Sequence, residues 1–163
     1  RSSDLLSGTL EKLNQPKLEV QKQLTPAPRW WRDFNQLVAP SPWIALEPSQ
    51  AEGDLSAELF SSVVENLMRN ASEKRLRDPA LQLQVKLIDG DNGVELEVSD
   101  NGEPIAEDIA RNLFSVPVDS KSGLGIGLYQ AARHAELTGY QLELSENRLG
   151  RVCFRLAPTT LCR

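Results

Sequence analysis

The sequence predicts an α+β fold, with helices packed on one face of a mixed β-sheet. Two observations indicate this class: two alternating runs flank a glycine-rich turn at 89–93, and two stretches with helical spacing of apolar residues lie on either side of that hairpin. A second strand pair closes the chain. Segregated strands and helices of this kind are typical of an α+β domain, and 163 residues suffice for one such domain with its own core.

Composition narrows the function classes. The net charge of −5 argues against nucleic acid or an anionic membrane as a partner, and no apolar run approaches the roughly 20 residues that span a bilayer. Cys153 and Cys162 do not form a disulfide framework, and a single histidine nearly excludes a histidine-based metal site. Cys153 lies in an alternating run and is expected to be a free structural thiol. The chain opens at Arg1 without Met and has an intracellular character, so we expect a fragment of a longer protein.

The first third of the chain predicts short elements. Periodic leucines over 5–13 resemble the last turns of an amphipathic helix, which Pro16 interrupts. A short strand is expected within 18–24. Aromatic and aliphatic residues at helical spacing predict a helix over 30–38, where the paired tryptophans are expected to pack in the core. A strand is expected at 43–46.

The middle of the chain predicts a long helix followed by a hairpin. Asp54 is the expected N-cap of a helix whose apolar positions run over 55–71. Residues 81–88 and 94–98 alternate as strands on either side of the 89–93 turn.

The last third predicts two helices and a strand pair. A short helix is expected over 104–114, with the proline in its first turn. A glycine-rich run opens a helix through Leu137, and Gly139 stands at its C-cap. Strands are expected over 140–144 and 152–156, joined by a turn.

Two asparagines on the long helix are the first candidate functional pair. Asn66 and Asn70 are four residues apart, so they share a face that begins apolar and turns polar. Asparagine is a poor helix former, and a carboxamide oxygen is a hard ligand suited to Mg²⁺. Two solvated asparagines are the simpler interpretation of this pair taken alone.

Two glycine-containing motifs follow. Asp100 ends a strand, where its carboxylate can accept a hydrogen bond from an exocyclic amine, and Gly102 lets the backbone approach a flat ring. A simple turn is the alternative. The glycines within 123–127 precede a helix and can present backbone N–H groups to an anion, with Lys121 just upstream. This run meets neither the Rossmann nor the P-loop context.

The order of these motifs resembles the GHKL ATPase superfamily, and most closely the catalytic, ATP-binding domain of bacterial sensor histidine kinases. The resemblance covers roughly residues 18–158 and implies a two-layer α/β sandwich, the Bergerat fold, with a mixed, mostly antiparallel sheet. The matching segments are 65–71 for the N box, 98–102 for the G1 box, 113–118 for the F box, 121–128 for the lid end and G2 box, and 150–158 for the closing strand.

The resemblance also implies roles for individual residues. Asn70 would coordinate Mg²⁺, and Asn66 would support the metal and the phosphates; these two are the implied catalytic residues. Asp100 would bind the adenine amino group, Gly102 would let adenine approach, and Lys121 would contact phosphate from the lid. The remaining implied ATP-binding residues are Lys74, Gly123, Leu124, Gly125, Ile126, Gly127 and Leu128.

The sequence departs from the family pattern in ways that bear on chemistry. Pro104 stands where the G1 box has a second glycine, and Glu73 replaces a common lysine, with Lys74 about 100° further around the helix. Relatives that hydrolyse ATP have a glutamate base where this chain has Asn66, which favours phosphoryl transfer over rapid hydrolysis. His134, the single histidine, is expected to be structural because it follows the glycine-rich loop on a helix.

The implied function is transfer of the ATP γ-phosphoryl to a histidine on the protein's own dimerisation domain upstream of Arg1, for relay to a response regulator. Residues 1–15 would be the tail of a dimerisation helix or a linker, and 16–163 the catalytic domain. The full-length protein would be a homodimer, and this domain would be cytoplasmic. The full-length protein could still be anchored in the inner membrane. The alternatives are an anti-sigma serine kinase of the same superfamily and a non-catalytic nucleotide-binding module, which Glu73 and Pro104 would favour.

Overall fold

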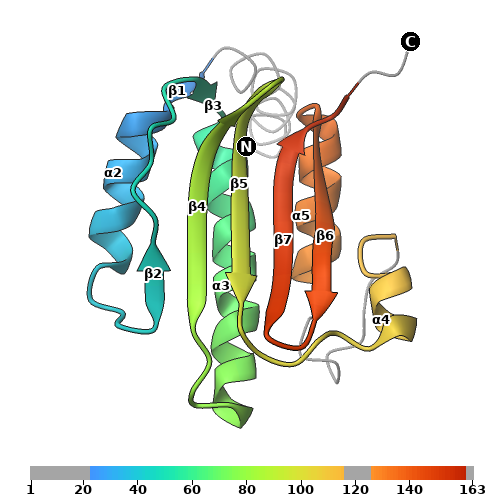
Figure 1. Ribbon diagram of the computed structural model, residues 1–163. Helices are drawn as coiled ribbons and strands as arrows, with labels where there is room; N and C mark the ends of the chain where they lie inside the picture. The colour runs from blue at the N-terminus through green and yellow to red at the C-terminus, as the bar shows by residue number, and fades with distance from the viewer. Residues whose placement is uncertain (1–22, 116–125, 161–163) are drawn as a thin grey trace, which may run out of the picture.

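A mixed five-stranded sheet forms one layer of the domain (Figure 1). The computed structural model describes residues 23–115 and 126–160. In spatial order the strands are β2 (Ile44–Leu46), β4 (Leu83–Gly90), β5 (Gly93–Asp100), β7 (Arg151–Pro158) and β6 (Tyr140–Arg148). The β2–β4 pair is parallel and the other three pairs are antiparallel, which confirms the mixed, mostly antiparallel sheet.

Helices form the second layer on one face of this sheet. The helices are α2 (Ala27–Val38), α3 (Ala57–Arg77), α4 (Glu107–Arg111) and α5 (Gly127–Leu137). In Figure 1, α3 and α5 lie behind the sheet and α2 lies beside them near β2, while the short α4 sits beyond β6. Two further strands, β1 (Thr25–Pro26) and β3 (Asp54–Leu55), pair with each other. The predicted two-layer α+β architecture is therefore confirmed.

An aromatic cluster joins α2 to α3. The rings of Trp30 and Phe60 meet edge to face with centroids 5.7 Å apart, and Trp30 Nε1 donates a hydrogen bond to Ser61 Oγ at 3.0 Å. Trp30 and Trp31 are both buried, so the predicted core role of this pair is confirmed. The cluster fixes α3 against its neighbours, and α3 carries the first candidate functional residues.

The second face of the sheet is covered by its own charged side chains. Arg155 donates to Glu143 at 3.2 Å and from its Nε to Glu95 at 3.0 Å, and Arg151 pairs with Glu146 at 2.7 Å. Cys153 lies on this face and is only 1% exposed. The expectation of a free structural thiol at this position is confirmed, and the thiol is buried.

Several predicted boundaries are wrong: α2 begins at Ala27 rather than at 30, β6 continues to Arg148 rather than ending at 144, and two helix starts near the site differ. Asp54 does not cap α3, because it is paired in β3; the N-cap is Ser56, whose Oγ accepts a hydrogen bond from the Leu59 amide at 3.3 Å. The helix expected over 104–114 is only α4, and Pro104 precedes it in an extended loop. Tertiary hydrogen bonds hold that loop and prevent the helix from starting earlier.

The predicted glycine after α5 is confirmed, whereas several other predictions concern residues outside 23–115 and 126–160. Gly139 follows α5 with φ +81°, as a C-terminal glycine should. No helix within 23–115 and 126–160 has the length and apolarity needed to cross a membrane. The helix tail expected before Pro16, the start of the strand expected within 18–24, Cys162, and the lid residues Lys121, Gly123, Leu124 and Gly125 lie outside the described residues.

Candidate functional site: a pocket between α3 and the end of β5

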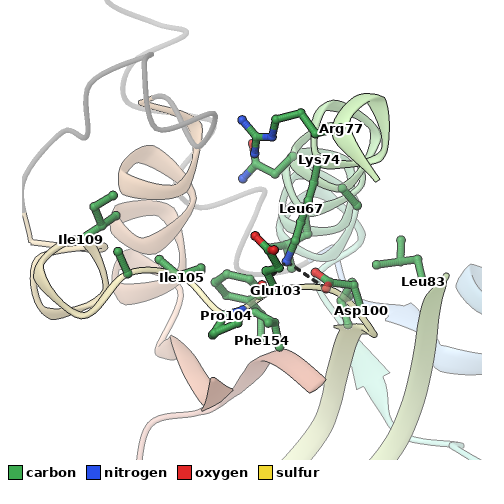
Figure 2. A pocket seen from close by; sticks show the side chains of 15 residues that line it. Leu67, Lys74, Arg77, Leu83, Asp100, Glu103, Pro104, Ile105, Ile109 and Phe154 are labelled. Atoms are coloured by element: carbon green, nitrogen blue, oxygen red, sulfur yellow. Dashed lines mark hydrogen bonds and ion pairs between the residues drawn. The ribbon is translucent and has the colours of Figure 1, made fainter. Parts of the chain in front are cut away.

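A pocket of about 170 Å³ opens between the C-terminal half of α3, the end of β5 and the loop over 101–106 (Figure 2). Its walls are mostly apolar and include Leu67, Leu83, Val98, Ile105 and Phe154. A few polar residues also line it, namely Asn70, Lys74, Arg77, Asp100 and Glu103. An apolar cleft with a few convergent polar groups is the usual form of a small-molecule site.

Asp100 supplies the carboxylate of this pocket. It is the last residue of β5, and its side chain is 10% exposed. The Oδ1 atom accepts hydrogen bonds from the Gly102 amide at 2.9 Å and from Lys74 Nζ at 3.0 Å. Within the described residues no hydrogen bond uses Oδ2. This carboxylate therefore offers one unused acceptor oxygen to a ligand.

Gly102 is required at its position by packing. A Cβ atom there would lie 2.6 Å from Leu81 Cδ1 and 2.9 Å from Lys74 Cε. The residue is buried, and its backbone passes close to the lysine stem. These contacts within the protein explain why glycine stands here, and the prediction that Gly102 lets a flat ring approach stays a prediction.

The loop over 101–106 is anchored by a residue that the sequence did not single out. Asn147, near the end of β6, accepts a hydrogen bond from the Ile105 amide through Oδ1 and donates from Nδ2 to the Ile105 carbonyl, both at 2.8 Å. The Gly150 amide donates to the Gly102 carbonyl at 2.9 Å. In the sequence, Asn147 lies in a stretch typical of a turn. Its partner Ile105 lies 42 residues away, so no local sequence signal predicts this hydrogen bond.

One of the two asparagines of α3 lines the pocket, and the other is not among its lining residues. Asn70 lines it, and its Nδ2 atom is buried with no hydrogen-bond partner. Asn66 lies one turn earlier, where its Nδ2 donates to the Ser62 carbonyl at 2.8 Å. A buried amide without a partner is rare in native proteins, and it indicates that Asn70 faces a polar ligand, ion or water.

The N-terminus of α5 meets α3 beside Asn66. A Cβ atom on Gly127 would lie 2.2 Å from Asn66 Oδ1, so the last glycine of the glycine-rich motif contacts the first asparagine. Ile126 is 51% exposed at the helix start, whereas Leu128 is 0% exposed. Leu128 is therefore a core residue, and its predicted contact with ATP stays a prediction.

Lys74 lies at the opposite end of this helical face. Asn66, Asn70 and Lys74 follow one another at intervals of four residues, and the first and last are about 12 Å apart along the axis. Besides Asp100, Lys74 Nζ donates to the Glu103 carbonyl at 2.6 Å. Figure 2 shows Lys74 and Asp100 pointing toward each other across the pocket. A role of Lys74 at the phosphates is not supported, because both of its hydrogen bonds lie at the carboxylate end.

Fold and site together define a nucleotide-binding domain of the two-layer GHKL type. The chain belongs to the family of histidine kinase-, DNA gyrase B- and HSP90-like ATPases, whose model matches residues 56–160. The matched segment contains both asparagines of α3, Lys74, Asp100, Gly102 and the start of α5.

Sensor proteins are among the similar sequences. The chain is 36% identical over 67 residues to the sensor protein LytS of Bacillus cereus, covering 41% of this chain and 11% of that protein. It is 33% identical over 98 residues to the sensor protein FixL of Bradyrhizobium diazoefficiens, covering 59% of this chain and 19% of that protein. The chain thus spans a fifth or less of the length of these relatives.

Solved structures share the fold. The catalytic domain of histidine kinase ThkA superimposes with a TM-score of 0.62 at 20% identity, covering 83% of this chain and 97% of that domain. ThkA in complex with the response regulator protein TrrA gives a TM-score of 0.63 at 20% identity, covering 97% of this chain and 49% of that one. At this identity the likeness establishes the architecture.

Proposed function

We propose that this domain binds Mg-ATP and supplies the γ-phosphoryl group to a histidine on a separate dimerisation domain of its own protein. The observation that carries the proposal is the arrangement along α3, where Asn66 lies against the α5 N-terminus, Asn70 follows one turn later and Lys74 stands beside Asp100. A nucleotide has a matching polarity, with phosphates at one end and a base at the other. The similarity to sensor histidine kinases supports the same assignment.

The carboxylate end of the pocket suits adenine. The free Oδ2 of Asp100 can accept the hydrogen of the 6-amino group, while Leu83, Val98 and Phe154 supply apolar surface for the ring. Gly102 keeps the backbone near this carboxylate free of a side chain. A charge-assisted hydrogen bond in an apolar cleft discriminates strongly against a base that lacks the donor.

The asparagine end suits Mg²⁺ and phosphate. The unpartnered amide of Asn70 requires a polar neighbour, and its carboxamide oxygen is a hard donor of the kind that Mg²⁺ accepts. Asn70 would hold the metal, and Asn66 would support it. When bound, Mg²⁺ neutralises charge on the phosphates.

The glycine-rich segment would complete the phosphate site. The first amides of α5 have no partner within the helix, as in any α-helix, and the helix start carries a partial positive charge, so it favours an anion. We assign phosphate contacts to the backbone amides of Gly123, Gly125 and Gly127 and to their neighbours Leu124, Ile126 and Leu128. Lys121 would add a charged contact from the same segment.

The chain's own residues favour transfer over hydrolysis. Asn66 cannot act as a base toward water, and it is already hydrogen-bonded to the helix backbone. His134 is half-buried on α5, so it is a poor acceptor. The acceptor histidine would therefore lie upstream of Arg1, with 1–15 as the link to it and 16–163 as the catalytic domain.

The proposed reaction implies partners and a compartment. The phosphohistidine would pass its group to a response regulator, as the ThkA–TrrA complex illustrates for that kinase. The parent would be a homodimer through its dimerisation helices, with this domain in the cytoplasm where ATP is available.

Labelled nucleotide tests the proposal. The isolated domain should bind Mg-ATP in calorimetry but incorporate no label from γ-labelled ATP, because it lacks a nucleophile held in line. Adding the upstream dimerisation helices in trans should produce acid-labile phosphohistidine, and Asn70→Ala should abolish it. Label that appears on the isolated domain and vanishes in His134→Ala would contradict an acceptor histidine outside this domain. Absence of Mg-ATP binding would contradict the proposed function as a whole.

A further inference from the structure

Lys74 makes two hydrogen bonds at the carboxylate end of the pocket. Its Nζ atom donates to Asp100 Oδ1 at 3.0 Å and to the Glu103 carbonyl at 2.6 Å. The lysine side chain is 21% exposed, and its stem lies against Gly102. One side chain of α3 therefore ties together the carboxylate at the end of β5 and the loop that walls the pocket.

These contacts leave the carboxylate with one acceptor free. Asp100 Oδ1 already accepts from the Gly102 amide and from Lys74, so its Oδ2 is the atom available to a base. An ionised carboxylate is an acceptor only. A 6-amino purine offers a donor to that atom, whereas a 6-oxo purine offers a carbonyl oxygen that the carboxylate repels.

We propose that Lys74 is a positioning residue for base selection: it fixes Asp100 and the loop over 101–106 so that Oδ2 faces the 6-amino group of a purine. This inference rests on the proposed nucleotide-binding function. Lys74 touches neither phosphate nor metal in this assignment and acts through Asp100. The anchoring of Ile105 by Asn147 holds the far end of the same loop.

Removing the lysine charge should loosen the carboxylate. Lys74→Met keeps most of the stem volume against Gly102 but deletes both hydrogen bonds. Asp100 would then keep only its backbone donor, and its side chain could rotate away from the base. We expect affinity for ADP to fall on the order of tenfold, which corresponds to about 1.4 kcal/mol, because the ligand must then order the Asp100 carboxylate and the loop that Lys74 holds in the wild type.

The decisive experiment compares ligands that differ at one end only. Dissociation constants for ADP, inosine 5′-diphosphate and adenosine would be measured with the wild-type domain, Lys74→Met and Lys74→Arg. The Lys74→Met variant should weaken ADP and adenosine by the same factor and reduce the preference for ADP over inosine 5′-diphosphate. Lys74→Arg keeps the charge and should retain most of that preference.

Two controls separate positioning from other roles. In an Asp100→Asn background, Lys74→Met should cause little further loss, because the lysine acts through that carboxylate. Lys86→Met removes one positive charge on the opposite face of the sheet and should leave all three affinities unchanged. If Lys74→Met does not fold, as judged by circular dichroism, Lys74→Gln takes its place in every comparison.

Each outcome decides a separate question. Loss of ADP affinity with unchanged adenosine affinity would place Lys74 at the phosphates and overturn the inference. Unchanged base preference in a folded variant, or full additivity with Asp100→Asn, would overturn it as well. A wild-type domain that binds no adenine nucleotide would instead contradict the proposed function itself.

Discussion

Gly127 at the start of α5 lies so close to Asn66 of α3 that a Cβ atom would come within 2.2 Å of the asparagine Oδ1. This contact joins two motifs that are about 60 residues apart in the sequence. It also fixes where the α5 N-terminus points relative to the asparagine face. The proposed phosphate site depends on that alignment.

Gly127→Ala should therefore impair both stability and nucleotide binding. The added methyl group must displace the Asn66 amide, and overpacking of this kind costs about 1–3 kcal/mol. Thermal melts should show a lower Tm, and calorimetry should show weaker Mg-ATP binding. The double variant Asn66→Ala/Gly127→Ala relieves the clash and should recover most of the Tm but not the affinity. A Gly127→Ala variant with wild-type Tm and affinity would contradict the close contact.

Asp100→Asn should weaken ATP binding while the domain stays folded. The asparagine carbonyl can still accept from the Gly102 amide, but the charge that attracts the adenine amino group and pairs with Lys74 is lost. A charge-assisted hydrogen bond of about 1.5–3 kcal/mol corresponds to a loss of roughly 10- to 150-fold in affinity. Calorimetry measures the affinity, and circular dichroism checks the fold. Unchanged affinity in a folded variant would remove Asp100 from the site.

Asn147→Ala should release the wall of the pocket. Two hydrogen bonds of 2.8 Å to the Ile105 backbone are lost, which together contribute about 1–3 kcal/mol. We expect faster hydrogen exchange at the Ile105 amide and weaker ADP binding, since the loop must then be ordered by the ligand. Asn92→Ala changes an exposed asparagine at the β4–β5 turn and serves as the matched control. Equal exchange rates in the two variants would count against the anchoring role.

Alkaline pH should destabilise the domain in part through Tyr140. Burial, with a smaller effect from Glu95, raises the pKa of this phenol above its usual value of 10.0. Its hydroxyl donates to the Val94 carbonyl at 3.1 Å, which also favours the neutral form. As pH rises past 10, the unfolded chain loses this proton first, so the free energy of unfolding falls.

Tyr140→Phe should flatten that dependence. The variant loses one hydrogen bond and is less stable at neutral pH, but its urea midpoint should decline less steeply between pH 10 and 11 than that of the wild type. Burial also raises the pKa of Cys153 above 9.0, so a shallower decline should remain in the variant. Parallel pH profiles for the two proteins would rule out ionisation of Tyr140 as a contributor.

Local patterns in the sequence determined much of the fold. The spacing of apolar residues predicted α2 and α3, and strict alternation around a glycine turn predicted the β4–β5 hairpin. These predictions succeed because helix and strand periodicities are set by backbone geometry over a few residues. The ordered motifs around Asn66, Asp100 and Gly127 likewise indicated a nucleotide site, since each motif is short and its chemistry is local.

Only the tertiary structure decided how those motifs meet. Lys74 lies 26 residues from Asp100, and Asn147 lies 42 residues from Ile105, so their hydrogen bonds depend on helix placement and strand register. The same holds for the two helix starts near the site. Because Asp54 pairs in β3 with β1, Ser56 and not Asp54 caps α3. Because the loop over 101–106 is anchored, α4 begins after Pro104, at Glu107. A side chain's partner across the fold is fixed by packing of the whole chain, and local spacing carries no information about it.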